Sequence, residues 1–306
     1  MKNLLIASIV FLTSLTVMFF CISGQDVINY DLSLNRIHRM PLVQDDPYAA
    51  MAHGGAPNPQ RDARFRKWLS NGLKISVRGG SGSGTIIYHD TKTGWAYVQS
   101  CGHLWDGNMS AEEGRRRQLN CSVTTWYHNQ KKLLRAKSYD AQVLYYSNRD
   151  GQDVALVRFK PDWKPDYLPI APSGYQLSEG MRLHSVGCDG GREVAHYDVR
   201  LIGKQDRGRG FYDYVTTENS PRPGRSGGGL SVDNYFVGVC WGTSNYNGTG
   251  NGYFTSLDTV RRHNEMNGYG WLNDVGYSIA RMIPIVDRNN PQGSYPKDYI
   301  PLPRGR

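Results

Sequence analysis

Short runs of apolar, β-branched and aromatic residues, often alternating with polar ones, fill the middle of the chain. Gly, Asn and Asp separate many of these runs, a pattern typical of antiparallel strands. The runs lie at 75–78, 85–88, 95–98, 121–127, 143–146, 154–159, 183–186, 197–201, 212–217, 230–232, 235–241 and 253–257. Only 258–266 has a helical pattern in this region. So many short strands without interleaved helices predict an all-β sandwich or barrel.

The first 24 residues have the pattern of a secretory signal peptide. A charged start at Lys2 precedes an apolar run from Leu4 to Phe20, and the small residues Ser23 and Gly24 follow shortly after it. We therefore expect export, to the medium, the periplasm or the cell surface. The apolar run is long enough that an uncleaved membrane anchor remains the alternative, and only then do we expect contact with a membrane.

The remaining chain divides by composition into three parts. Residues 25–70 are polar and interrupted by prolines, which indicates a linker or pro-segment that ends in a short basic helix around 61–69. Residues 71–267 hold the predicted strands and form the candidate functional domain. Residues 268–306 are rich in Tyr, Pro, Gly and Asn, so we expect a tail that wraps the surface or lacks fixed structure.

The chain of 306 residues carries a formal net charge of +9, which raises the question of a nucleic-acid partner. Basic residues cluster at 61–67 and at 115–117, but neither cluster lies in a recognisable binding motif. The second cluster closely follows Glu112 and Glu113. We expect solvated segments or a cell-surface contact, and no nucleic acid.

Four cysteines remain once the predicted signal is removed: Cys101, Cys121, Cys188 and Cys240. Their even number suits two disulfides in an oxidising compartment, and buried free thiols on strands suit the sequence equally well. No Cys-x-x-Cys spacing is present, so the sequence predicts no metal centre.

A serine between glycines provides the candidate chemistry. Gly-Arg-Ser-Gly-Gly-Gly-Leu at 224–230 predicts a tight turn that leads into a strand and exposes Ser226. A serine hydroxyl needs a base and an orienting acid to become a nucleophile. His103 follows a strand-like run in Ser-Cys-Gly-His, and Asp153 opens Asp-Val-Ala-Leu, so these two residues are the candidate partners.

Together these three segments resemble the trypsin-like (chymotrypsin-fold) serine peptidases, particularly the bacterial members. The order His103, Asp153, Ser226 is that of the family, and the likeness extends from about 75 to 263. The resemblance implies two packed six-stranded antiparallel barrels of the chymotrypsin type with a C-terminal helix. It also implies a serine endopeptidase that acts on protein or peptide substrates and needs no cofactor.

The resemblance assigns a role to each candidate. His103 would be the general base, Asp153 would orient it, and the N–H groups of Gly224 and Ser226 would form the oxyanion hole. Asp150 is a rival for the acid. An α/β-hydrolase elbow is a weak alternative, because it needs the order Ser, Asp, His and only His263 follows the serine.

Two residues depart from the family pattern. Arg225 stands where many animal members have an Asp that pairs with a newly cleaved N-terminus, so we expect that activation switch to be absent. Cys240 stands where the family has a Ser that helps to hold the catalytic Asp, and a thiol is a weaker donor. These departures leave a second hypothesis, an inactive protease-fold protein that binds a partner or serves at a surface.

Substrate recognition is also implied by the resemblance. Ser220 would lie at the base of the primary pocket, with Gly242 and Gly252 along its walls, and the strand of Cys240, Trp241 and Gly242 would pair with the substrate backbone. An uncharged base between glycines predicts an apolar or aromatic substrate side chain rather than Lys or Arg.

Overall fold

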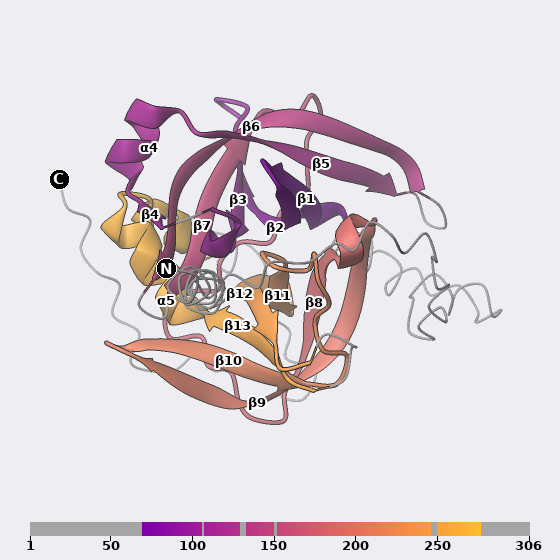
Figure 1. Ribbon diagram of the computed structural model, residues 1–306, viewed down its shortest axis with the longest axis vertical. Helices are drawn as coiled ribbons and strands as arrows, with labels where there is room; N and C mark the ends of the chain where they lie inside the picture. Colours follow the sequence, from indigo (N-terminus) through magenta and orange to yellow (C-terminus); the bar gives the residue numbers. More distant parts are fainter. Residues whose placement is uncertain (1–68, 106, 129–132, 150–151, 246–249, 277–306) are drawn as a thin grey trace, which may run out of the picture. The chain divides into compact units, whose positions relative to one another are not determined.

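The computed structural model describes residues 69–105, 107–128, 133–149, 152–245 and 250–276 (Figure 1). The predicted signal peptide, almost all of the linker and residues 277–306 lie outside these ranges, so the expectations about them remain predictions. Of the basic helix expected around 61–69, the structure describes only the end, and residues 69–71 are helical. In the described ranges, no helix combines the length and the apolar character needed to cross a membrane.

The first half of the domain is a closed antiparallel barrel (Figure 1, indigo to magenta). Its strands are β1 (Gly72–Val77), β2 (Gly80–His89), β3 (Ala96–Ser100), β5 (Asn120–His128), β6 (Leu133–Arg149) and β7 (Gln152–Phe159). They follow the order β6-β5-β1-β2-β3-β7, and β7 pairs again with β6 to close the barrel. The two-residue strand β4 (Asn108–Met109) extends the sheet by pairing with β6.

The second half forms another closed barrel (Figure 1, salmon to orange). Its strands are β8 (Arg182–Cys188), β9 (Val194–Gly208), β10 (Phe211–Thr217), β11 (Gly229–Val232), β12 (Tyr235–Thr243) and β13 (Gly252–Ser256), in the order β10-β13-β12-β11-β8-β9. The helix α5 (Leu257–Met266) follows β13 and starts where the Ser256 hydroxyl accepts the N–H of Thr259. The predicted fold, two six-stranded barrels and a C-terminal helix, is confirmed.

Alternating residues of the strands form the two cores. In the first barrel, Ile75, Val98 and Val157 are completely buried. In the second barrel, Leu183 and Val199 face each other across β8 and β9 and are equally buried. This period of two is what the alternation in the sequence predicted.

One helix was missed. We expected helix only at 258–266, but Ala111–Arg117 forms the helix α4. The Ser110 hydroxyl accepts the N–H of Glu113, which is the Ser-x-x-Glu signal of a helix start. Two ion pairs four residues apart, Glu112 with Arg116 and Glu113 with Arg117, lie on its exposed surface. The basic cluster at 115–117 is thus largely paired within its own helix.

Three short 3-10 helices complete the described part: η1 (Gly102–Leu104), η2 (Asp189–Gly191) and η3 (Gly270–Asp274). Leu272 of η3 is buried, and the amide of Asn273 donates to the carbonyl of Arg261 in α5. The start of the segment predicted as a tail therefore packs on α5.

Hydrogen bonds join the two barrels at the ends of their strands. The N–H of Ser83 in β2 donates to the carbonyl of Ser226, at 2.6 Å. The Thr255 hydroxyl in β13 donates to the carbonyl of Asp153, at 2.8 Å. Both bonds involve a predicted catalytic residue, so the candidate site lies where the barrels meet.

Candidate active site

His103 and Asp153 lie on neighbouring strand ends of the first barrel. His103 belongs to η1, just after β3, and Asp153 is the second residue of β7, which pairs with β3. The Nδ1 of His103 lies 2.6 Å from Oδ2 of Asp153, while Oδ1 accepts the N–H groups of Gly102 and His103 at 2.6 and 2.9 Å. With both oxygens engaged, the carboxylate fixes the imidazole by its Nδ1 edge. Asp150, the rival acid, lies outside the described residues.

The surroundings of His103 favour its charged form. Burial by itself would lower the pKa of the imidazole, but the Asp153 carboxylate, 2.6 Å from Nδ1, outweighs burial and raises the pKa well above the ordinary value. Burial also raises the pKa of the Cys101 thiol, which therefore stays neutral at neutral pH. Asp153 is thus the charge that stabilises an imidazolium here.

Ser226 lies on the turn that leads into β11 and packs against the first barrel. A Cβ added to Gly82 would meet the Ser226 carbonyl at 2.7 Å and the Leu104 side chain at 2.8 Å. Ser226 and Leu104, which follows His103, therefore both pack against this glycine. Within the part of the chain that the structure describes, the Ser226 hydroxyl does not hydrogen-bond to His103. The Nε2 of His103 instead contacts the Cys101 sulfur, at 3.7 Å.

The backbone of the serine turn leaves two donors unused. Gly224 has φ +91°, and a Cβ there would lie 2.6 Å from the Cys188 carbonyl oxygen, so only glycine fits. The N–H groups of Arg225 and Gly227 donate to the carbonyls of Arg222 and Cys240. Among the described residues, the N–H groups of Gly224 and Ser226 donate no backbone hydrogen bond. These are the two donors predicted for the oxyanion hole.

Arg225, between those two donors, is fully buried. Its guanidinium forms two hydrogen bonds with the Asp189 carboxylate, at 2.8 and 3.0 Å, and lies over the ring of Tyr197. It also donates to the carbonyls of Ser185 and Ala195. Arg225 was unusual in the sequence, but no pattern there pointed to Asp189 as its partner. A buried guanidinium requires an acid, but the burial of Arg225 is visible only in the fold.

Cys240 fixes the serine turn through its backbone. Its carbonyl accepts the N–H of Gly227 at 2.7 Å, and its N–H donates to the carbonyl of Gly228 at 2.8 Å. Among the described residues, no hydrogen bond joins its sulfur to Asp153. All four cysteines outside the predicted signal peptide are buried free thiols, so the structure supports that alternative and contains no disulfide between them.

The residues predicted for the primary pocket lie together. The Ser220 hydroxyl contacts the Thr243 hydroxyl at 2.6 Å, next to Gly242. A Cβ on Gly252 would come within 2.6 Å of Pro221. No atom lies within 4 Å of the place where a Cβ on Gly242 would sit, so this glycine borders open space.

Trp241 is surrounded by groups that the sequence did not suggest. Its ring lies 5.4 Å from that of Tyr253, and the Arg207 guanidinium lies 4.9 Å from its centre. Asp213 of β10 is almost completely buried, 3.3 Å from Arg207. Burial raises the pKa of Asp213 to about 7, although Arg207 works against that shift.

Comparison with known proteins identifies the family. The model of the trypsin-like peptidase domain matches residues 82–239, more than half of the chain, so the chain belongs to that family. The Rv3671c protease of M. tuberculosis in its active form covers 70% of this chain and 88% of its own, at 17% identity and a TM-score of 0.48. Its inactive form covers 70% and 98%, at 19% identity and 0.48. Human heparin binding protein covers 66% and 92%, at 15% identity and 0.48. The comparison with curated proteins finds no match.

Proposed function

We propose that this protein is an exported serine endopeptidase that cleaves peptide bonds through His103, Asp153 and Ser226. The observation that carries the proposal is the 2.6 Å contact between His103 Nδ1 and Asp153 Oδ2, with the other carboxylate oxygen bound by two N–H groups. That arrangement leaves Nε2 to act as the base.

In the proposed mechanism, His103 takes the proton of Ser226 as the hydroxyl attacks the substrate carbonyl. Asp153 holds the imidazole in the required tautomer and stabilises its charge. The N–H groups of Gly224 and Ser226 bind the developing oxyanion, and His103 then protonates the leaving amine. Water hydrolyses the acyl-enzyme by the same steps. The hydroxyl of Ser226 must come within hydrogen-bonding distance of Nε2, and catalytic hydrogen bonds often tighten in this way only when substrate binds.

We further propose that the protease selects apolar or aromatic side chains. Ser220 is neutral and Gly242 borders open space, whereas the buried acid Asp213 lies on β10 next to Arg207. A site for Lys or Arg would need a carboxylate at its base, and Ser220 does not provide one.

Ester hydrolysis with a chromogenic leaving group tests the covalent mechanism. We expect a burst of leaving group equal to the enzyme concentration, followed by slow turnover, because the acyl-enzyme accumulates. Ser226→Ala should show no burst. Linear release from the wild type, equal to that of Ser226→Ala, would contradict the proposal.

One observation favours a second candidate, a protease-fold protein without turnover that binds a partner. His103 Nε2 faces the Cys101 sulfur at 3.7 Å, and the Ser226 hydroxyl is not bonded to it among the described residues. If this geometry persisted with substrate bound, the serine would lack its base. Binding of a peptide without cleavage by the wild type would favour this candidate.

A further inference from the structure

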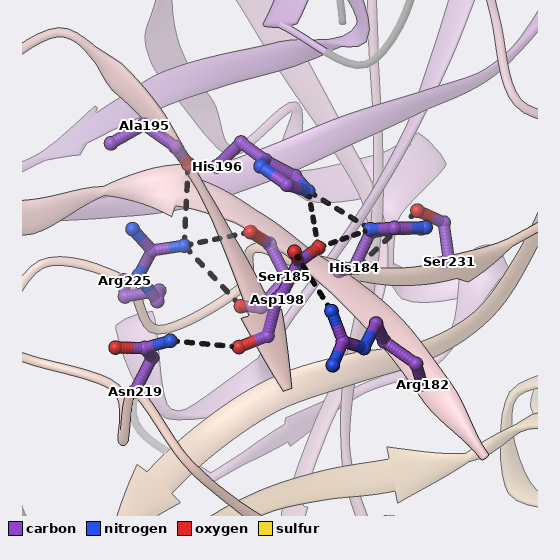
Figure 2. Close-up of polar contacts among 9 residues, drawn as sticks. All are labelled: Arg182, His184, Ser185, Ala195, His196, Asp198, Asn219, Arg225 and Ser231. Carbon is purple, nitrogen blue, oxygen red and sulfur yellow. Dashed lines mark hydrogen bonds and ion pairs between the residues drawn. The ribbon is translucent and has the colours of Figure 1, made fainter. Parts of the chain in front are cut away.

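Three polar side chains of the second barrel, none of them a proposed catalytic residue, converge on one point. His184 comes from β8, and His196 and Asp198 come from β9 (Figure 2). His184 pairs directly with Asp198 in the strand register, and His196 lies two residues earlier on β9. Since side chains alternate along a strand, all three lie on one face, opposite to the buried pair of Leu183 and Val199.

The nitrogen and oxygen atoms of these residues that could bind a metal ion surround one point. His184 Nδ1 lies 3.0 Å from His196 Nε2 and 2.9 Å from Asp198 Oδ1, and the last two atoms are 3.4 Å apart. Zinc binds imidazole nitrogen and carboxylate oxygen at about 2.0–2.2 Å, so ligand atoms of a tetrahedral site lie about 3.3 Å apart. Side-chain shifts of a few tenths of an ångström bring all three atoms to that spacing.

The backbone that carries the cluster is held from several sides (Figure 2). The Asn219 amide donates to the carbonyl of Asp198, and the Ser231 hydroxyl donates to that of His184. Arg225 donates to the carbonyls of Ser185 and Ala195, the neighbours of His184 and His196. Ligands on such fixed strands are pre-organised, as metal sites require.

Burial and charge also suit a bound cation. The side chain of His196 is 4% exposed, whereas that of Asp198 is 42% exposed, so the cluster reaches from the protein interior to solvent. The Arg182 guanidinium lies 3.9 Å from Oδ2 of this carboxylate, and its side chain is 61% exposed. Oδ1 is directed at the two histidines, and solvent reaches the cluster from the Asp198 side.

We propose that His184, His196 and Asp198 bind one divalent transition-metal ion of the zinc type, with water completing the coordination. The ion would cross-link β8 and β9, the two strands that hold Arg225. We assign it a structural role, because none of the three ligands is among the proposed catalytic residues. Cysteine spacing carries no signal for this site, because the site depends on the register in which β8 and β9 pair.

Calorimetric titration of the untagged, chelator-treated protein with Zn²⁺ tests the proposal. We expect one ion per chain in the wild type. His184→Gln and Asp198→Asn should each weaken binding by about tenfold or more, and Zn²⁺ should raise the Tm of the wild type but not of these variants. His89→Gln, which alters a histidine of the first barrel, is the matched control and should bind as the wild type does.

A further variant tests the other cluster of possible metal ligands, Cys101, His103 and Asp153. His103→Ala should bind Zn²⁺ unchanged, and binding lost in that variant alone would overturn the proposal. The absence of saturable binding, or equal binding in the wild type and both cluster variants, would also overturn it.

Co²⁺ gives a readout on the wild type that does not depend on the folding of any variant. A site of two imidazoles and a carboxylate should give visible d–d bands without a thiolate charge-transfer band. A thiolate band would place the metal at a cysteine and would contradict the proposal.

Discussion

The guanidinium of Arg225 and the carboxylate of Asp189 form a two-pronged ion pair, Nε to Oδ1 at 2.8 Å and Nη2 to Oδ2 at 3.0 Å. Arg225 directly precedes Ser226, and Asp189 begins η2 at the end of β8. A cation at position 225 cannot pair with a protonated N-terminus, so the serine turn is anchored by an acid from within the chain. This fits the expectation that no cleavage-dependent switch operates through residue 225.

Loss of this ion pair should destabilise the protein strongly. We expect Asp189→Asn to lower the free energy of unfolding by about 3–5 kcal/mol, because it leaves a fully buried guanidinium without its counter-charge. Chemical denaturation measures this change. Activity should fall as well, because the turn between Gly224 and Ser226 loses its anchor.

The matched control for that variant is Asp274→Asn, which removes an exposed acid from η3 and should change stability by less than about 0.5 kcal/mol. Equal stability of Asp189→Asn and the control would show that the pair does not anchor the turn.

The rise of activity with pH should reflect the raised pKa of His103. The base must be neutral to accept the Ser226 proton, so kcat/KM should increase with pH, with a midpoint above the ordinary histidine value of about 6.5. Asp153→Asn should reduce kcat by about ten-thousand-fold and move the midpoint down, since the negative charge is gone. A wild-type midpoint below that of free histidine would refute this reading of the site.

Two glycines of the predicted pocket should respond differently to enlargement. Gly242→Val should leave stability almost unchanged, because no atom lies within 4 Å of the new Cβ, and should reduce kcat/KM for large apolar substrates. Gly252→Val should cost about 1–3 kcal/mol, because its Cβ would clash with Pro221 and with Thr216. Thermal melts and kinetics with a substrate series separate the two effects. A Gly242→Val enzyme with unchanged kinetics would remove Gly242 from the pocket.

Asp213 should make stability depend on pH. Its folded pKa of about 7 exceeds the ordinary Asp value of about 3.9, so between these values the folded chain keeps a proton that the unfolded chain has lost. This group therefore makes stability fall as pH rises from about 4 to 7. Asp213→Asn should flatten that slope in Tm measured against pH.

The exposed Asp140 of β6 provides the control for Asp213, and Asp140→Asn should keep the wild-type slope. If Asp213→Asn and the wild type had the same slope, Asp213 would be ionised throughout this range.

Local patterns were sufficient to predict much of the fold. The run at 154–159 marked β7, and the motif around Asp153 marked the strand end that brings this residue to His103. The helix α4 had an equally local signal in Ser110 and Glu113, although we predicted no helix there. In β6, only 143–146 was predicted, because the rest of its 17 residues includes polar Lys137 and Ser138, whose backbones pair with β5.

Contacts between distant segments could not be predicted. Asp189 and Arg225 are 36 residues apart, and no periodicity links them. His184 and Asp198 meet because β8 and β9 pair in one particular register, and a shift of one residue would place them on opposite faces. Such pairs form only when the barrel closes. The sequence implies a barrel, but it does not specify the register in which the strands pair.

Labelling by a fluorophosphonate probe tests the central claim most directly, because the probe reacts only with an activated serine. We predict that the wild type is labelled once per chain at Ser226, and that Ser226→Ala and His103→Ala are not labelled. Absence of labelling in folded wild-type protein, with the segment before residue 69 intact or trimmed, would contradict the account and leave a protease fold without protease chemistry.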